Sequence, residues 1–164
     1  MFTQSDSRMP THRHHQKIRH YGYRTQPAEP ARLVALGHDY VCIWDCYEQG
    51  GGLCKLSTLI QEISGSTRWH QIPDLLEDVN DGKLVAFPVC HQVWLPRFQF
   101  DAGYGVLNPV RRSVALLRCH LDSVEMALWF CTPNELLEGE PPMDAVHSIP
   151  ESVVLAARAR RLEG

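Results

Sequence analysis

Four helix-start signals follow one another in the C-terminal third of the chain, and they constrain the fold more than any other feature of the sequence. They are Asn108-Pro109, Asp122 with Glu125, Thr132-Pro133-Asn134-Glu135, and Ser148 with Glu151. Asn and Asp cap helix N-termini, proline suits the first turn, and a cap followed three residues later by Glu has the spacing of a capping box. The pattern predicts short helices near residues 109–120, 123–131, 133–138, 142–147 and 149–162.

Two apolar stripes indicate how these helices pack. One consists of Val110, Val114, Leu117 and Leu121, and the other of Val124, Ala127, Leu128 and Cys131. Spacings of three and four residues place each stripe on one helix face. Because the links between the helices are short, we expect antiparallel neighbours in a compact helical module.

The segment from residue 33 to residue 66 predicts strands followed by a helix. β-branched and aromatic residues in 33–47 favour strands, with a turn at Gly37-His38-Asp39. The glycines at 50–52 predict a loop, since regular structure is costly for consecutive glycines. Apolar residues from Leu53 to Ile63 recur at helical spacing, and Ser64-Gly65-Ser66 ends this helix. Ser66 is then the predicted cap of a second short helix.

A third helix and a hairpin are predicted next. Pro73 suits the first turn of the helix, which would bury Leu75, Leu76 and Val79 and end at the turn Asn80-Asp81-Gly82. The extended runs 83–89 and 93–100 predict a hairpin, or wing, and their prolines, Pro88 and Pro96, place them at an edge or bulge.

Charge is unevenly distributed along the 164 residues. The net charge is −3, but residues 1–32 carry +4 and four histidines, whereas residues 33–164 carry −7. Residues 1–31 are polar and almost free of aliphatic side chains, which predicts a disordered basic arm. The arm could bind nucleic acid or metal, or it could be a solubilising tail or an expression remnant.

The cellular setting follows from what the sequence lacks. It contains no apolar secretory region and no apolar run long enough to cross a membrane. We therefore expect a cytoplasmic protein without membrane association, whose six cysteines are reduced thiols.

The sequence offers few groups arranged for catalysis. His38, Cys42 and Cys46 are spaced to share one face, with Cys54 further on, and zinc accepts such ligands. However, there is no Cys-x-x-Cys knuckle, and free cysteines often act as small buried apolar residues. No nucleophile–base pair is evident, and the glycines at 50–52 match no phosphate-binding loop. We expect no catalytic residue, metal or cofactor, and a zinc or thiol enzyme is kept as an alternative.

A helix, a Ser-Gly-Ser turn, a second helix and a wing follow the order of a helix-turn-helix DNA-binding unit. The first residues of a recognition helix contact bases, so the candidate DNA-binding residues are Ser66, Thr67, Arg68, His70 and Gln71. The charge of this region argues against DNA binding, because residues 55–100 hold four Lys/Arg and five acidic residues. The alternative is a helix-turn-helix retained only as a packing unit.

The C-terminal motifs resemble the toxin-binding domain of the Xre/MbcA/ParS antitoxin family. The residues that carry the resemblance are Trp129, Pro133-Asn134, Leu137, Gly139, Pro142 and Asp144. Upstream, the stretches at 82–87 and 96–101 are similar to the wing and the Phe-Gln-Phe-Asp segment of some relatives. The chain departs from the pattern at Met143, where relatives often have Leu, and at His147-Ser148-Ile149-Pro150, which replaces a Thr-Gly pair.

The resemblance implies a bacterial antitoxin whose helical module covers a RES-type, NAD-degrading toxin, and whose helix-turn-helix represses its operon, usually as a homodimer. The candidate partner-binding residues are Trp129, Pro133, Asn134, Arg158, Arg160 and Arg161. The arginines could reach an anionic pocket, or they could simply complement the helix C-terminus. Trp129 could equally fill the local core.

The expected fold is α+β and mainly α, in three parts. These are an arm at 1–31, a strand-containing and helix-turn-helix/wing region at 32–101, and a helical partner-binding module at 102–164. The alternative function is a stand-alone DNA-binding transcriptional regulator with no toxin partner.

Overall fold

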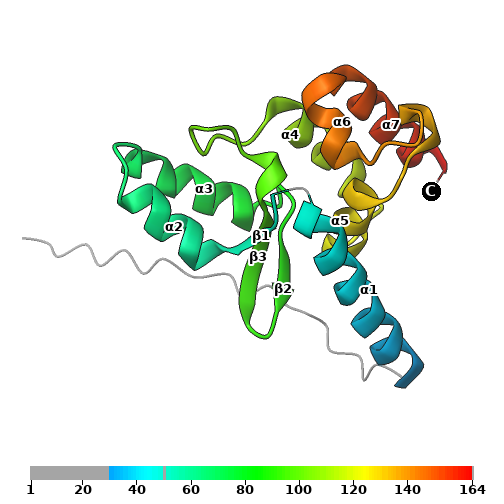
Figure 1. Ribbon diagram of the computed structural model, residues 1–164, viewed down its shortest axis with the longest axis horizontal. Helices are drawn as coiled ribbons and strands as arrows, with labels where there is room; N and C mark the ends of the chain where they lie inside the picture. The colour runs from blue at the N-terminus through cyan, green and yellow to red at the C-terminus, as the bar shows by residue number, and fades with distance from the viewer. Residues whose placement is uncertain (1–29, 50, 164) are drawn as a thin grey trace, which may run out of the picture.

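The computed structural model describes residues 30–49 and 51–163 and has an α+β, mainly helical architecture (Figure 1). The helices are α1 Pro30–Gln49, α2 Leu56–Ser64, α3 Ile72–Asn80, α4 Asn108–Leu117, α5 Ser123–Cys131, α6 Pro142–Ser148 and α7 Pro150–Glu163. The strands are β1 Leu53–Lys55, β2 Phe87–Val89 and β3 Gln92–Pro96. Short 3₁₀ turns occupy Trp69–Gln71, Arg97–Gln99 and Glu135–Leu137. The disordered arm predicted for 1–31 falls almost entirely on residues 1–29, outside the described residues.

The strands predicted for residues 33–47 are wrong, because this segment belongs to helix α1. Tyr40, Ile43 and Tyr47 are spaced by three and four residues, and Ile43 and Tyr47 are fully buried. The Tyr47 hydroxyl donates to the carbonyl oxygen of Ala127 on α5 at 2.8 Å, which anchors the helix. Packing of this stripe on α5 outweighs the strand preference of the β-branched residues, and the turn predicted around Gly37 lies inside the helix.

The predicted hairpin is confirmed as β2 and β3, the antiparallel pair of a three-stranded sheet with the order β1-β3-β2. Cys90 and His91 form its two-residue turn, with φ of 47° and 62°, as turns compatible with strand twist require. Pro88 lies in an edge strand, as predicted. Pro96 instead ends the central strand, where it pairs with Leu53.

The region between the sheet and α3 differs from the prediction at Ser66. Its hydroxyl donates to the carbonyl oxygen of Ile63 at 2.7 Å and accepts from the Arg68 amide at 3.1 Å. Ser66 therefore closes the end of α2, and a turn and a 3₁₀ segment replace the predicted second helix. The predicted loop is confirmed at Gly51 and Gly52, while Gly50 lies outside the described residues, and the third helix, with Pro73 in its first turn, is confirmed as well. Leu75 is buried, but Leu76 is 37% exposed.

The helical module agrees closely with the prediction, although one segment is 3₁₀ rather than α-helical. Asp122 and Glu125 form the predicted capping box at the start of α5. The boxes predicted at Thr132 and Ser148 are wrong, because these hydroxyls donate back to carbonyl oxygens of the preceding helices. Helix α4 begins at Asn108 itself, so this residue is not its cap.

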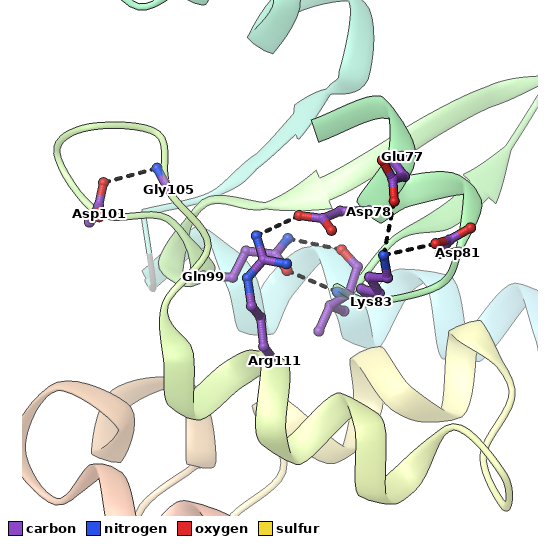
Figure 2. Close-up of polar contacts among 9 residues, drawn as sticks. Glu77, Asp78, Asp81, Lys83, Gln99, Asp101, Gly105 and Arg111 are labelled. Atoms are coloured by element: carbon purple, nitrogen blue, oxygen red, sulfur yellow. Dashed lines mark hydrogen bonds and ion pairs between the residues drawn. The ribbon is translucent and has the colours of Figure 1, made fainter. Parts of the chain in front are cut away.

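Two hydrophobic clusters are joined by polar contacts between the hairpin region and the helical module. The larger cluster unites α1, β2 and α4–α7, and the smaller one unites β1, β3, α2 and α3. Between them, Arg111 on α4 pairs with Asp78 on α3 at 2.5 Å (Figure 2). The fully buried Gln99 side chain bonds both backbone groups of Val85 at 2.9 Å. The Arg111–Asp78 pair therefore joins α3 to α4, and Gln99 joins the segment before β2 to the segment after β3.

Candidate partner-binding and nucleic-acid interfaces

The structure brings the five candidate DNA-binding residues together at the α2–α3 turn. Thr67, Arg68 and His70 are exposed, whereas Ser66 and Gln71 are half-buried. Arg68 donates from Nη1 to the carbonyl oxygen of Gly103 at 3.2 Å, so its guanidinium is drawn toward the loop before α4. The Gln71 Oε1 atom is buried without a hydrogen-bond partner among the described residues. Thr67 and His70 are consequently the candidates best placed to meet a ligand.

Trp69 is a surface residue that the sequence reasoning missed. Its side chain is 66% exposed and lies edge-on to His70, with ring centroids 6.3 Å apart. A tryptophan so exposed is uncommon on a monomer surface, although single exposed apolar residues need no explanation by themselves. Its exposure could not be predicted from the sequence, because residues 66–68 form a turn rather than the predicted helix.

The outer face of α3 is acidic, which bears on DNA binding. Asp74 and Glu77 are exposed beside the partly exposed Leu76. In a helix-turn-helix this helix would enter the major groove, where carboxylates meet phosphate repulsion. Lys83 is close by, but its ammonium group pairs with Asp81 at 2.8 Å and with Glu77 at 3.3 Å. The geometry therefore offers little free positive charge on this face.

Trp129 and Asn134 have structural roles in the helical module. The Trp129 ring is half-buried and packs edge-on against Phe130, with centroids 4.8 Å apart. Asn134 caps the following 3₁₀ turn, accepting from the Leu136 amide at 2.9 Å, while its carbonyl oxygen accepts from the Leu137 and Gly139 amides. Pro133 is exposed.

The same loop presents an apolar side chain. Asn134 and the buried Leu137 hold a tight bend, which Gly139 completes at φ 85°. Leu136, between them, is left 62% exposed. The motif that carries the family resemblance therefore shapes a loop, and its apolar tip is the part that a partner could contact.

Helix α7 has two different faces. Val153, Ala156 and Ala157 are buried against the rest of the module. The opposite face carries Leu155, which is 58% exposed, and Leu162, which is 83% exposed, with Arg158 between them. The spacing of three and four residues from 155 to 158 to 162 makes this a single stripe. We call Leu155, Arg158 and Leu162 the α7 stripe.

The two other candidate arginines of α7, Arg160 and Arg161, are also exposed. The charges of this helix were recognisable in the sequence, whereas its exposed leucines were not among the predicted residues. Their exposure was nevertheless predictable, because the helical repeat places Leu155 and Leu162 on a different face from the buried positions 153, 156 and 157.

The α7 helix is fixed to the module at its start. Arg112 on α4 forms a two-pronged pair with Glu151, with distances of 2.6 and 3.0 Å. The hydrogen bonds from Arg112 lower the pKa of the Glu151 carboxyl, so it stays ionised. Figure 1 shows α7 running beside α4 and α6 to the end of the chain.

Comparisons with family models, with curated proteins and with solved structures found no match for this chain. Within residues 30–49 and 51–163, no three His, Cys, Asp or Glu side chains are grouped so that they could hold a metal ion. His38 and Cys42 do lie in contact, with Nδ1 and Sγ 3.5 Å apart, but Cys54 is buried in the other hydrophobic cluster. None of the described helices is both long and apolar enough to cross a membrane.

Proposed function

We propose that this chain is an antitoxin-like binding protein that docks onto a partner protein through the outer face of α7. The α7 stripe is the observation that carries the proposal. It places two largely exposed leucines around Arg158 on a helix whose other face is packed. Aliphatic and arginine side chains on a rigid helix face are suited to a protein groove.

Rigidity supports this choice of surface. Burial of Val153, Ala156 and Ala157 and the Arg112–Glu151 pair hold α7 in place before binding, so little ordering is required when a partner docks. Exposed Arg161 next to the stripe adds positive charge, which favours a partner with an acidic rim. By the resemblance, this partner is a RES-type, NAD-degrading toxin.

Capture from a lysate of the native host, using the full chain as bait, tests the proposal. The expected result is a stoichiometric partner with a RES-type toxin fold, and its loss when Leu155→Asp is the bait. Leu76→Asp is the matched control, because Leu76 is also a partly exposed helical leucine but lies on α3. Recovery of no RES-type protein, or equal recovery with both variants, argues against docking through α7.

The second candidate function is DNA-binding regulation, either of the chain's own operon or as a stand-alone regulator. The order of helix α2, a turn, helix α3 and the β2–β3 hairpin favours it, because this is the order of a helix-turn-helix unit followed by a wing. The acidic face of α3 opposes it. We therefore rank it below partner binding.

Fluorescence anisotropy with the upstream operator fragment tests this second function. Specific binding should weaken steeply with salt, with a slope set by the number of phosphates contacted. Arg68→Gln should weaken it, whereas Arg112→Gln, on the other part of the molecule, should not. Salt-independent or undetectable binding removes this candidate.

A further inference from the structure

A cavity of about 400 Å³ lies between the hairpin and the corner where α4 turns into α5. Leu84, Phe87 and Val93 line one wall, and Val114 and Met126 line the other. Its volume is in the range of small-molecule sites, which are mostly apolar with a few polar groups that fix orientation. None of the residues proposed above for partner or DNA binding lines this cavity.

One cation stands at the rim of the cavity. Arg118, near the end of α4, donates from Nη1 to the backbone carbonyl oxygen of Asp81 at 3.3 Å. A neutral carbonyl does not compensate the guanidinium charge, and no carboxylate forms an ion pair with Arg118 among the described residues. A guanidinium has five N–H donors, so most remain available for a further acceptor.

The acidic groups near this rim are already engaged. Oδ1 of Asp122 accepts from the amides of Val124 and Glu125 at 2.8 and 2.9 Å, at the positive end of α5. The Asp81 carboxylate pairs with the ammonium group of Lys83. Two charged side chains line the cavity: the Asp122 carboxylate is bound by backbone amides at the start of α5, whereas Arg118 has no carboxylate partner among the described residues.

We propose that this cavity binds a small amphipathic monoanion, whose apolar body lies between the hairpin and α4–α5 and whose carboxylate pairs with Arg118. Planar guanidinium and carboxylate groups form two parallel hydrogen bonds, which explains the choice of an anion over a neutral ligand. A water molecule occupies roughly 30 Å³ of the liquid, so the cavity has the volume of about a dozen groups of that size. A medium-length alkyl carboxylate has this size and chemistry.

Isothermal titration of the full chain with decanoate, below its micelle concentration, tests the proposal. The expected result is saturable binding of one decanoate per chain, and at least about tenfold weaker binding to Arg118→Gln. Arg161→Gln is the matched control and should bind decanoate like the unchanged protein. Decylammonium, an alkyl cation of the same chain length, should not compete.

A second variant tests the contribution of the cavity's volume separately from that of the Arg118 charge. Ala86 is half-buried in the cavity wall, so Ala86→Leu should fill part of the space and weaken binding even with Arg118 present. Circular dichroism should confirm that both variants keep the fold. No saturable binding, equal binding by all variants, or equally tight binding of decylammonium overturns the proposal.

Discussion

Replacing Gln99 by leucine should destabilise the protein far more than the same replacement of an exposed glutamine would. The Gln99 side chain is fully buried; Oε1 accepts from the Val85 amide, and Nε2 donates to the carbonyl oxygens of Val85 and Pro96, all at 2.9 to 3.0 Å. Leucine fills a similar volume but leaves the backbone groups of Val85, itself 0% exposed, without these partners. Each buried polar group left unpaired costs about 1–3 kcal/mol.

The expected loss for Gln99→Leu is about 3–5 kcal/mol, out of a total stability of about 8–25 kcal/mol for a chain of this length. Urea denaturation followed by tryptophan fluorescence measures it, and Tm should fall by about 10 °C. Gln61→Leu is the control, since Gln61 is exposed on α2. A loss within about 0.5 kcal/mol of the control would refute the reasoning, because surface substitutions usually have effects of that size.

Gln99→Glu adds a pH signature to the same test. The introduced carboxyl would face two carbonyl oxygens where Nε2 now donates, so its pKa in the folded state should rise above the unfolded value of about 4.3. The stability of the variant relative to the unchanged protein should therefore be highest below about pH 4 and should fall as pH rises through the folded pKa. If the stability of Gln99→Glu does not fall as pH rises, the site tolerates an ionised carboxylate, and the prediction is contradicted.

Two further predictions concern ion pairs. Arg111→Ala should cost about 2–4 kcal/mol in urea denaturation, because it leaves the nearly buried carboxylate of Asp78 without its partner. Arg112→Ala removes an exposed pair and should cost much less, so equal losses would contradict this prediction. The hydrogen bonds from Arg97 lower the pKa of Glu62, so this pair stabilises the fold above the unfolded pKa and is lost as pH falls through the folded one. Glu62→Gln should accordingly flatten the loss of stability in acid, and an unchanged acid profile would contradict the assignment.

The helical module was predictable because its signals are local. Capping residues, prolines and apolar spacing act within one or two turns, and they located α4, α5, α6 and α7 to within a few residues. The errors at Thr132 and Ser148 share a cause, since a hydroxyl can bond forward to an amide or back to a carbonyl oxygen. The path of the preceding helix decides which of these two hydrogen bonds is made, and the sequence does not specify that path.

Helix α1 was not predictable from local preference. Its β-branched and aromatic residues favour strands, and only the burial of Ile43 and Tyr47 against α5 distinguishes the helix. That contact joins residues far apart in the sequence. The stripe formed by Tyr40, Ile43 and Tyr47 was nevertheless present, and its helical spacing is a better guide than residue composition in a segment of this length.

The candidate site was predictable in part. The arginines of α7 were selected from charge, and the structure shows two exposed leucines, Leu155 and Leu162, on the same helix. The Asn134 motif was selected by resemblance, and its hydrogen bonds show that it shapes the loop that exposes Leu136. The cavity beside Arg118 could not be predicted, because its walls come from the hairpin and from α4–α5, which meet only in the folded chain.

The most direct test of docking through α7 is the inhibition of NAD hydrolysis by a purified RES-domain toxin from the same host, titrated with the full chain. We predict inhibition that is complete near one chain per toxin, at least about tenfold weaker inhibition with Leu155→Asp, and unchanged inhibition with Leu76→Asp. Full activity of the toxin in the presence of excess chain, or equal inhibition by the two variants, would contradict the account.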